Sequence, residues 1–279
     1  MSIELHTNRL RHSRIPAVTE VERQYSPFLI GWFRWYVRGY LRKHFHGVRI
    51  SRIGAPPESI DGPVIVVLNH ASWWDPLIGV LLSEIWKQRR HFVPIDATSL
   101  KKYSFFSKMG FFGIEPNSVP GGAKFLRTAL SLIQHDDSMI WITAQGSFTD
   151  PRQRPIRLQP GAGHLAAHME RGHVIPLAIE YPFWSERTPE ALIHFGEPIS
   201  IAGDLSLSGQ EWTDRIADGL QSAQDNLADL AMSRDPDEFY SALAGKAGVG
   251  GIFDVWRRFL AFMTGCKFTP EHGDDLWHG

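Results

Sequence analysis

The chain has 279 residues, of which 43% are hydrophobic and 21% are charged, and its formal net charge is −1. This composition is that of a folded globular protein, so it excludes an intrinsically disordered chain. The charge argues against a nucleic-acid-binding protein, which needs a broad basic surface. The single cysteine, Cys266, excludes an internal disulfide framework and indicates a reducing compartment.

The N-terminal segment is polar and charged and has no apolar core, so we expect no secretory signal. Uncharged apolar stretches fall short of the roughly 18 residues that a membrane-spanning helix needs, so we expect no transmembrane helix.

Ser26 and Pro27 predict the start of a helix that runs to about Phe45. Three arginines fall on one stripe of this helix, and aromatic side chains gather roughly opposite. A membrane-interface helix has this pattern, but a helix that packs on the core with solvated arginines explains it equally well. The stripe consists of Arg34, Arg38 and Arg42, and the aromatic face of Phe28, Trp32, Trp35, Tyr36 and Tyr40.

The stretch from Pro63 to Pro76 (P-V-I-V-V-L-N-H-A-S-W-W-D-P) predicts a strand, a turn and the start of a helix. Val64–Leu68 is an unbroken β-branched and apolar run, which is typical of a strand buried on both faces. Asp75 before a proline is typical of a helix N-terminus. We therefore expect His70 and Asp75 in the turn at the carboxyl end of a strand, where ligands usually bind in α/β folds.

A tight turn can bring the Asp75 carboxylate onto one imidazole nitrogen of His70. The carboxylate would then fix the tautomer and raise the basicity of the other nitrogen, which could take a proton from a hydroxyl. A histidine satisfied by a local carboxylate, with a purely structural role, explains the same spacing. The buried strand before the pair, and Asn69 and Ser72 beside it, leave both alternatives open.

The remaining chain alternates predicted strands and helices, so we expect an α/β fold with a mostly parallel central sheet flanked by helices. N-terminal amphipathic and C-terminal helical additions complete it. Further strands are predicted at Val48–Ile53, His91–Ile95, Ser138–Thr143, Val174–Glu180 and Leu192–Phe195. Helices are predicted at about Pro76–Gln88, Gly121–Gln134, Gly163–Arg171, Ser208–Met232 and Asp237–Leu243, and around Phe253, Trp256, Leu260 and Met263.

Several chemical signatures are absent from the sequence, namely the nucleophile elbow, the phosphate loop and the dinucleotide fingerprint. His164 and His168 are four residues apart, but the glutamate that would follow the first histidine of a metalloprotease helix is missing. We expect one of the two histidines to pack in the core and the other to be solvated.

Asn69–Asp75 (N-H-A-S-W-W-D) matches N-H-x-S-x-x-D, and by this motif the chain resembles the glycerolipid acyltransferase family, typified by 1-acylglycerol-3-phosphate acyltransferases. Gly110–Pro116 (G-F-F-G-I-E-P) is similar to the second block of the family. Ala144–Thr149 (A-Q-G-S-F-T) occupies the third, which is usually P-E-G-T-R-S. Three later family features follow in the right order, at Pro160–Ala166, Val174–Leu177 and Phe195–Pro198. The resemblance therefore covers about residues 48–200.

The resemblance implies that His70 is the base for a hydroxyl attacking an acyl thioester, and that Asp75 orients it. Acyl-CoA or acyl carrier protein is then the co-substrate, and thioester chemistry needs no metal or other cofactor. A developing oxyanion needs hydrogen-bond donors. Backbone N–H groups near Gly146, or at the helix that begins at Asp75, are the candidates.

Three of the departures from the family concern charged residues. The second block normally ends in arginine, where this chain has Pro116, and the glutamate and arginine of the third block are replaced by Gln145 and Phe148. The two family arginines are associated with the phosphate of the acceptor. Their absence removes charge-assisted phosphate contacts.

Two explanations fit these departures. Either Arg152, Arg154 and Arg157 supply phosphate contacts from the next loop, or the acceptor carries no phosphate there. We favour the second explanation, in which Gln145 and Ser147 hydrogen-bond the neutral hydroxyls of a lipid such as a glycolipid. The full set of expected substrate-binding residues is Asn69, Ser72, Gln145, Gly146, Ser147, Arg152 and Arg154.

We expect three parts in the chain. Residues 1–47 form an N-terminal segment with the amphipathic helix, residues 48–205 the acyltransferase catalytic domain, and residues 206–279 a helical extension packed on the same domain. The expected function is O-acyl transfer to a lipid hydroxyl by a peripheral protein on the cytoplasmic face of a membrane. Alternatives are a lysophospholipid acyltransferase with relocated phosphate contacts, a catalytically silent acyl-lipid-binding protein, and a hydrolase.

Overall fold

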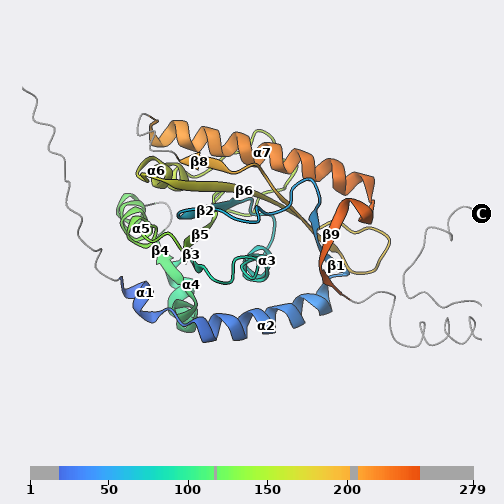
Figure 1. The fold of residues 1–279 in the computed structure, drawn as a ribbon, viewed down its shortest axis with the longest axis horizontal. Helices are drawn as coiled ribbons and strands as arrows, with labels where there is room; N and C mark the ends of the chain where they lie inside the picture. Colours follow the sequence, from blue (N-terminus) through green and yellow to red (C-terminus); the bar gives the residue numbers. More distant parts are fainter. Residues whose placement is uncertain (1–18, 116–117, 202–206, 246–279) are drawn as a thin grey trace, which may run out of the picture.

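The computed structural model describes residues 19–115, 118–201 and 207–245, which form one sheet enclosed between helices (Figure 1). Within the described residues the sheet has nine strands. Their bounds are β1 Gly47–Ser51, β2 Val64–Leu68, β3 Arg90–Asp96, β4 Phe111–Ile114, β5 Ser138–Thr143, β6 Gly172–Glu180, β7 Glu190–Phe195, β8 Ile199–Ile201 and β9 Phe239–Ala244.

Helices cover both faces of this sheet. Helices α2 and α3 pack on one face, and α5, α6 and α7 pack on the other (Figure 1). The α-helices are α1 Glu20–Gln24, α2 Pro27–His44, α3 Asp75–Leu82, α4 Ala97–Lys102, α5 Val119–Leu132, α6 Gly161–Ala167 and α7 Gly209–Ser233, and the 3-10 helices are η1 Ser104–Met109 and η2 Pro236–Glu238.

The strand order is β4-β3-β5-β2-β6-β7-β1-β9, with β8 paired to β6. The pairs from β4 through β6 are all parallel, as is the pair of β7 with β1. Antiparallel pairing occurs between β6 and β7, β6 and β8, and β1 and β9. The predicted α/β fold with a mostly parallel sheet is therefore confirmed.

Strand β2 lies in the middle of the sheet and is buried along its whole length. Val64, Val66 and Leu68 join the apolar cluster beneath α2 and α3, whereas Ile65 and Val67 join the cluster beneath α5, α6 and α7. The continuous apolar run is explained by this position, because both faces of the strand are covered by helices.

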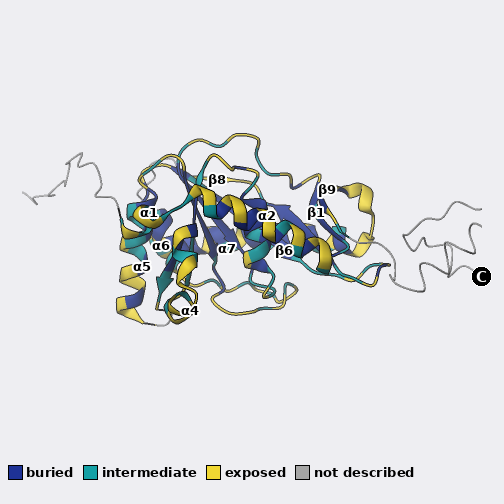
Figure 2. Ribbon diagram, turned by 90° about the horizontal axis from the view of Figure 1, so that it is seen from below, coloured by how far each residue is buried: buried dark blue, intermediate teal, exposed yellow. Residues whose placement is uncertain are grey.

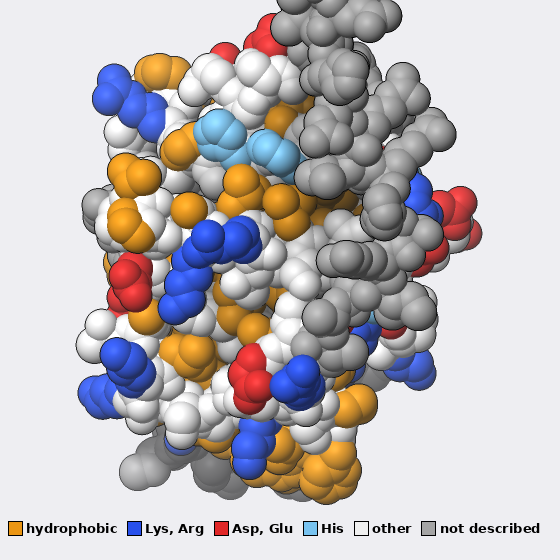
Figure 3. Space-filling view, turned by 90° about the vertical axis from the view of Figure 1, so that its left-hand side faces the viewer, with side chains coloured by type: hydrophobic (Ala, Val, Ile, Leu, Met, Phe, Trp, Pro, Cys, Tyr) orange, Lys and Arg blue, Asp and Glu red, His pale blue; other side chains and the backbone are white. Residues whose placement is uncertain are grey.

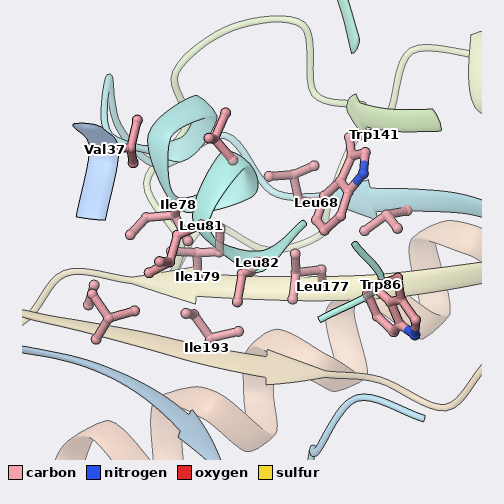
Figure 4. Packing of buried hydrophobic residues seen from close by; sticks show 14 of the residues in the cluster. Val37, Leu68, Ile78, Leu81, Leu82, Trp86, Trp141, Leu177, Ile179 and Ile193 are labelled. Atoms are coloured by element: carbon pink, nitrogen blue, oxygen red, sulfur yellow. The ribbon is translucent and has the colours of Figure 1, made fainter. Parts of the chain in front are cut away.

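Helix α3 leads away from the candidate site and packs onto the sheet. Figure 4 shows Ile78, Leu81 and Leu82 against Leu177 and Ile179, in the cluster to which all five belong. This helix is shorter than the predicted Pro76–Gln88. It ends at Leu82, and the turns that follow bring the side chain of Trp86 into the core, where it is 2% exposed.

The sheet splits between β3 and β5. Residues 90–92 of β3 pair with residues 138–140 of β5, but residues 93–96 pair with β4 alone. Strand β5 meanwhile continues beside β2 as far as Thr143. The carboxyl ends of β3 and β5 therefore diverge next to the end of β2.

Helix α2 lies across the sheet with one side exposed (Figure 2). Its buried side consists of Ile30, Phe33, Arg34, Val37 and Leu41. Arg34 was expected on a solvated stripe, but its guanidinium is buried and donates to the hydroxyl and carbonyl of Ser83 at 2.8 and 3.1 Å. The exposed side carries large aromatic residues, with Phe28 80%, Trp35 71%, Trp32 52% and Tyr36 47% exposed.

The helix predicted at Asp237–Leu243 is wrong, because this segment forms η2 and strand β9. Phe239 and Leu243 are buried and four residues apart, a spacing that places two side chains on one face of either a helix or a strand. Hydrogen bonding to a neighbouring strand decides between a helix and a strand. Strand β9 adds antiparallel to β1 at the edge of the sheet, where it satisfies backbone groups that would otherwise remain unpaired.

Three other expectations lie outside the described residues. They concern Pro116, Cys266 and the amphipathic pattern from Phe253 to Met263. On the end of the molecule shown in Figure 3, the described side chains carry charges of both signs, which accords with the formal net charge of −1.

Candidate active site

His70 and Asp75 meet in the turn between β2 and α3. The Nδ1 atom of His70 lies 2.7 Å from Oδ2 of Asp75. A carboxylate can only accept a hydrogen bond here, so Nδ1 carries the proton and Nε2 keeps a free lone pair. The His70 side chain is 19% exposed, whereas that of Asp75 is fully buried. The expected contact between His70 and Asp75 is present, and the imidazole is partly exposed to solvent.

Three donors satisfy the buried Asp75 carboxylate. Oδ2 accepts from His70 and from the Ser72 N–H at 3.0 Å, and Oδ1 accepts from the Tyr181 hydroxyl at 2.7 Å. Sequence reasoning missed Tyr181, which lies 106 residues beyond Asp75. Only the adjacency of β2 and β6 brings the two together, and the spacing within the motif gives no signal of it.

The backbone of His70 is held by the loop after β5. Its N–H donates to Oε1 of Gln145 at 2.7 Å, and its carbonyl accepts from the Thr149 N–H at 2.8 Å. The first and third sequence blocks are thus joined at the histidine itself. Gln145 is buried, and its carbonyl oxygen supports His70.

Asn69 does not face a substrate. Its side chain is fully buried, its amide nitrogen donates to the Ile179 carbonyl at 3.0 Å, and its oxygen accepts from the Ile179 N–H at 2.8 Å. The expectation that Asn69 binds substrate is corrected by these bonds, because both polar atoms are already used. Asn69 ties the end of β2 to β6.

Phe148 covers one side of the candidate base. Its ring centroid lies 4.5 Å from that of His70, and the residue is 62% exposed. An aromatic side chain therefore occupies the place where the family usually has arginine. The environment of the imidazole on this side is apolar and uncharged.

A cavity of about 980 Å³ begins at His70 and Asp75. It passes through the split in the sheet, because residues 93–96 of β3 line one side and residues 141–144 line the other. Apolar side chains form most of its wall, including Leu68, Phe111, Phe125, Leu126 and Trp141.

Charge on the cavity wall has one sign. Asp75, Asp96 and Glu115 line it, whereas no lysine or arginine among the described residues does. Asp96 caps α4 through the Ser99 N–H, and this backbone hydrogen bond is the main cause of its lowered pKa. His70, His91 and His164 also line it, so the wall offers carboxylates and imidazoles but no described lysine or arginine that could pair with a phosphate.

Arg152 and Arg154 lie off this wall, contrary to the expectation that they bind substrate. The Arg152 guanidinium pairs with Asp150 at 2.7 Å, and that of Arg154 pairs with Asp225 on α7. Each guanidinium is paired with a carboxylate, and neither residue lines the cavity. Of the two other third-block candidates, Gly146 lines the cavity and Ser147 is exposed.

Two of the expected backbone donors for an oxyanion are already engaged. The Gly146 N–H donates to the Thr143 carbonyl at 3.2 Å, and the Asp75 N–H donates to the Ser72 carbonyl at 3.2 Å. These two groups close turns that shape the site. Neither is free to stabilise charge on a substrate in this arrangement.

His91 forms part of the cavity wall on the α2 and α3 side. Its Nε2 donates to the Trp86 carbonyl at 3.0 Å, and its Nδ1 accepts from the Trp141 indole N–H at 3.1 Å. Burial, and then the nearby Arg34 cation, lowers the pKa of His91 to about 3. The ring is therefore neutral over the physiological range and fixes Trp141 in the wall.

Residues 42–180, about half of the chain, match the sequence model of the family described as Acyltransferase. The chain belongs to this family and is an acyltransferase. No curated protein matches the sequence.

A similar solved structure is the crystal structure of the 1-acyl-sn-glycerophosphate (LPA) acyltransferase PlsC from Thermotoga maritima. The two chains are 14% identical, the similarity covers 74% of this chain and 81% of that one, and the TM-score is 0.49. Among the described helices, none is both long enough and apolar enough to cross a membrane.

Acid should destabilise the fold through His91. An unfolded histidine binds a proton below about pH 6.5, whereas folded His91 stays neutral down to about pH 3. The unfolded state therefore binds more protons in this window, and stability falls as the pH falls, by up to ~1.4 kcal/mol per unit. Between pH 7 and pH 5 we expect a loss of about 2 kcal/mol from this residue.

Urea unfolding of the wild-type protein and of His91→Gln at both pH values measures this loss. The variant should be less stable at pH 7 but should lose about 2 kcal/mol less on acidification. His168→Gln, at an exposed histidine, serves as the control. Equal acid sensitivity of the wild-type protein and His91→Gln would contradict the assignment.

Proposed function

We propose that this acyltransferase moves a fatty acyl group from the thioester of acyl-CoA or acyl carrier protein to a hydroxyl of a lipid acceptor. His70 acts as the general base and Asp75 orients it. The observation that carries this proposal is the 2.7 Å contact between His70 Nδ1 and the buried Asp75 carboxylate, at the edge of a large apolar cavity.

The reaction is direct transfer between two bound substrates. Nε2 of His70 takes the proton of the acceptor hydroxyl as its oxygen attacks the thioester carbonyl carbon. The tetrahedral intermediate collapses with cleavage of the carbon–sulfur bond, and the leaving thiolate takes the proton back from the imidazolium. Asp75 stabilises the transient positive charge on the ring. This chemistry needs neither an acyl-enzyme nor a metal ion.

The cavity suits two lipid-like reactants. Its volume of about 980 Å³ is near the upper end of the ~300–1,000 Å³ that small-molecule sites usually occupy. Its wall comes from both sides of the split sheet, so two chains can approach His70 along different directions. When both reactants are bound next to one base, the reaction no longer depends on their chance encounter in solution, and this proximity raises its rate.

We further propose that the acceptor carries no phosphate near the reacting hydroxyl. Three carboxylates and no described lysine or arginine line the cavity, and the two arginines of the neighbouring loop are paired with Asp150 and Asp225. A phosphate in this cavity would lose hydration without gaining a cation. A glycolipid or another neutral polyol lipid fits the wall better. This arrangement disfavours the alternative of relocated phosphate contacts.

The outward side of α2 is proposed to lie on a membrane. Phe28, Trp32, Trp35 and Tyr36 occupy positions of one helix face and are all exposed, although four apolar residues of the same helix are buried against the sheet (Figure 2). Exposed basic residues flank this aromatic face, as in an interfacial helix that binds anionic lipid. They are Arg42 and Lys43, in the last turn of α2.

Replacement of His70 should abolish acyl transfer. We expect His70→Ala to lower kcat by on the order of 10²–10⁴-fold, because general-base catalysis contributes about that much. The assay is transfer of a labelled acyl group from acyl-CoA into lipid, with circular dichroism as the measure of folding. His168→Ala, at an exposed histidine off the cavity wall, is the matched control and should retain activity.

Product analysis in the same assay separates the alternatives. Release of free fatty acid, with or without acceptor lipid, would indicate a hydrolase. Binding of acyl-CoA without turnover would indicate a silent binding protein. Near-wild-type transfer by His70→Ala would remove this residue from the mechanism.

Acceptor preference tests the proposal about phosphate. Two acceptors that share the same acyl glycerol, one with a 3-phosphate and one with a neutral sugar, are compared by kcat/KM. We expect the sugar-bearing acceptor to be preferred by at least about tenfold, since an unpaired charge in the cavity costs more than a neutral hydroxyl. Equal or better use of lysophosphatidic acid would overturn this part of the proposal.

Membrane binding should depend on the aromatic face of α2. Flotation with vesicles of phosphatidylcholine and phosphatidylglycerol is expected to recover the wild-type protein and much less of a double Trp32→Ala, Trp35→Ala variant. The control is Tyr240→Ala, which removes an exposed aromatic side chain from β9. Undiminished flotation of the double variant would exclude this face as the membrane contact.

A further inference from the structure

The two oxygens of the Asp75 carboxylate are held from two neighbouring strands. Oδ2 meets His70, which follows β2, while Oδ1 accepts a hydrogen bond from Tyr181, which follows β6, at 2.7 Å. Strands β2 and β6 pair in parallel, so the residues that follow them lie at the same end of the sheet, where the carboxyl ends of these strands meet. The carboxylate therefore sits between a base and a phenol.

Tyr181 is held in position by the backbone before it and by the packing of its ring. Asn69 binds both backbone polar groups of Ile179, two residues before Tyr181, and thereby ties the end of β6 to the end of β2. The Tyr181 ring also packs against Phe45 of the apolar cluster, with centroids 5.7 Å apart. Few degrees of freedom remain for the hydroxyl.

The Tyr181 hydroxyl is a permanent donor. Burial, then the negative charge of Asp75 and the hydrogen bond to it, holds the pKa of Tyr181 well above its ordinary value of 10. The phenol therefore stays protonated at neutral pH and well above it.

We propose that Tyr181 is a positioning residue for the acyl-transfer reaction, fixing the rotation of the Asp75 carboxylate so that Oδ2 stays on Nδ1 of His70. The inference rests on the proposed function of the His70–Asp75 pair and adds a third member to it. Without the hydroxyl, Oδ1 would be left unpaired in a fully buried site, and the carboxylate would turn to share its other partners. The tautomer with the proton on Nδ1 would lose its preference, and fewer molecules would present a free Nε2.

The test is Tyr181→Phe, which removes one oxygen and keeps the packing of the ring. We expect kcat to fall by about tenfold, as for the loss of one hydrogen bond to a charged group, while KM changes by less than about twofold. In a double-mutant cycle with Asp75→Asn, the second substitution should add little, because Tyr181 acts through Asp75. Tyr240→Phe, on exposed β9, should match the wild-type protein in both constants.

A measurement independent of turnover separates this inference from the proposed function. Nitrogen-15 NMR of the imidazole, assigned by the loss of signals in His70→Ala, reports which nitrogen carries the proton. The wild-type protein and Tyr240→Phe should show the Nδ1–H tautomer, and Tyr181→Phe should show a mixture. If the His70→Ala assay shows no role in transfer, this spectrum still tests the positioning. Unchanged kcat and an unchanged tautomer in Tyr181→Phe, or fully additive effects with Asp75→Asn, would overturn it.

Discussion

The arrangement of the site depends on one buried carboxylate. Asp75 has no exposed surface, and a carboxylate without solvent must be met by donors or its burial becomes very costly. Its partners are an imidazole, a backbone N–H and a phenol, which come from the turn after β2 and from the end of β6. These donors meet at one point because of the strand order, the hydrogen bonds between Asn69 and Ile179, and the short turn into α3.

The split in the sheet opens the cavity that leads to His70 and Asp75. A continuous parallel sheet would close the space between β3 and β5, whereas residues 93–96 of β3 leave β5 and pair with β4, which opens it. The cavity that results is mostly apolar, and among its described residues it is lined by carboxylates and histidines but by no lysine or arginine. The proposal that the acceptor carries no phosphate near the reacting hydroxyl rests on this wall.

Several elements of the fold follow from local patterns. The run Val64–Leu68 predicts a strand covered on both faces, and Ser26-Pro27 predicts the start of α2, because burial on two sides and helix capping are local properties. The segment at 237–243 was predicted wrongly, since a spacing of four fits a helix and a strand equally. Arg34 lies on the buried side of α2, and only the position of Ser83 on a distant segment gives its guanidinium a partner.

The sequence by itself determined the strand, the turn and the pairing of His70 with Asp75, because all three involve neighbours within a few residues. It also indicated the missing phosphate contacts, since these are absences of arginine at given positions. Only the tertiary structure decided what surrounds the pair. Tyr181 reaches Asp75, Asn69 turns into the core, and Arg152 and Arg154 are drawn onto acidic partners. Each of these contacts depends on which strands and helices become neighbours, and that choice is made by the packing of the whole sheet.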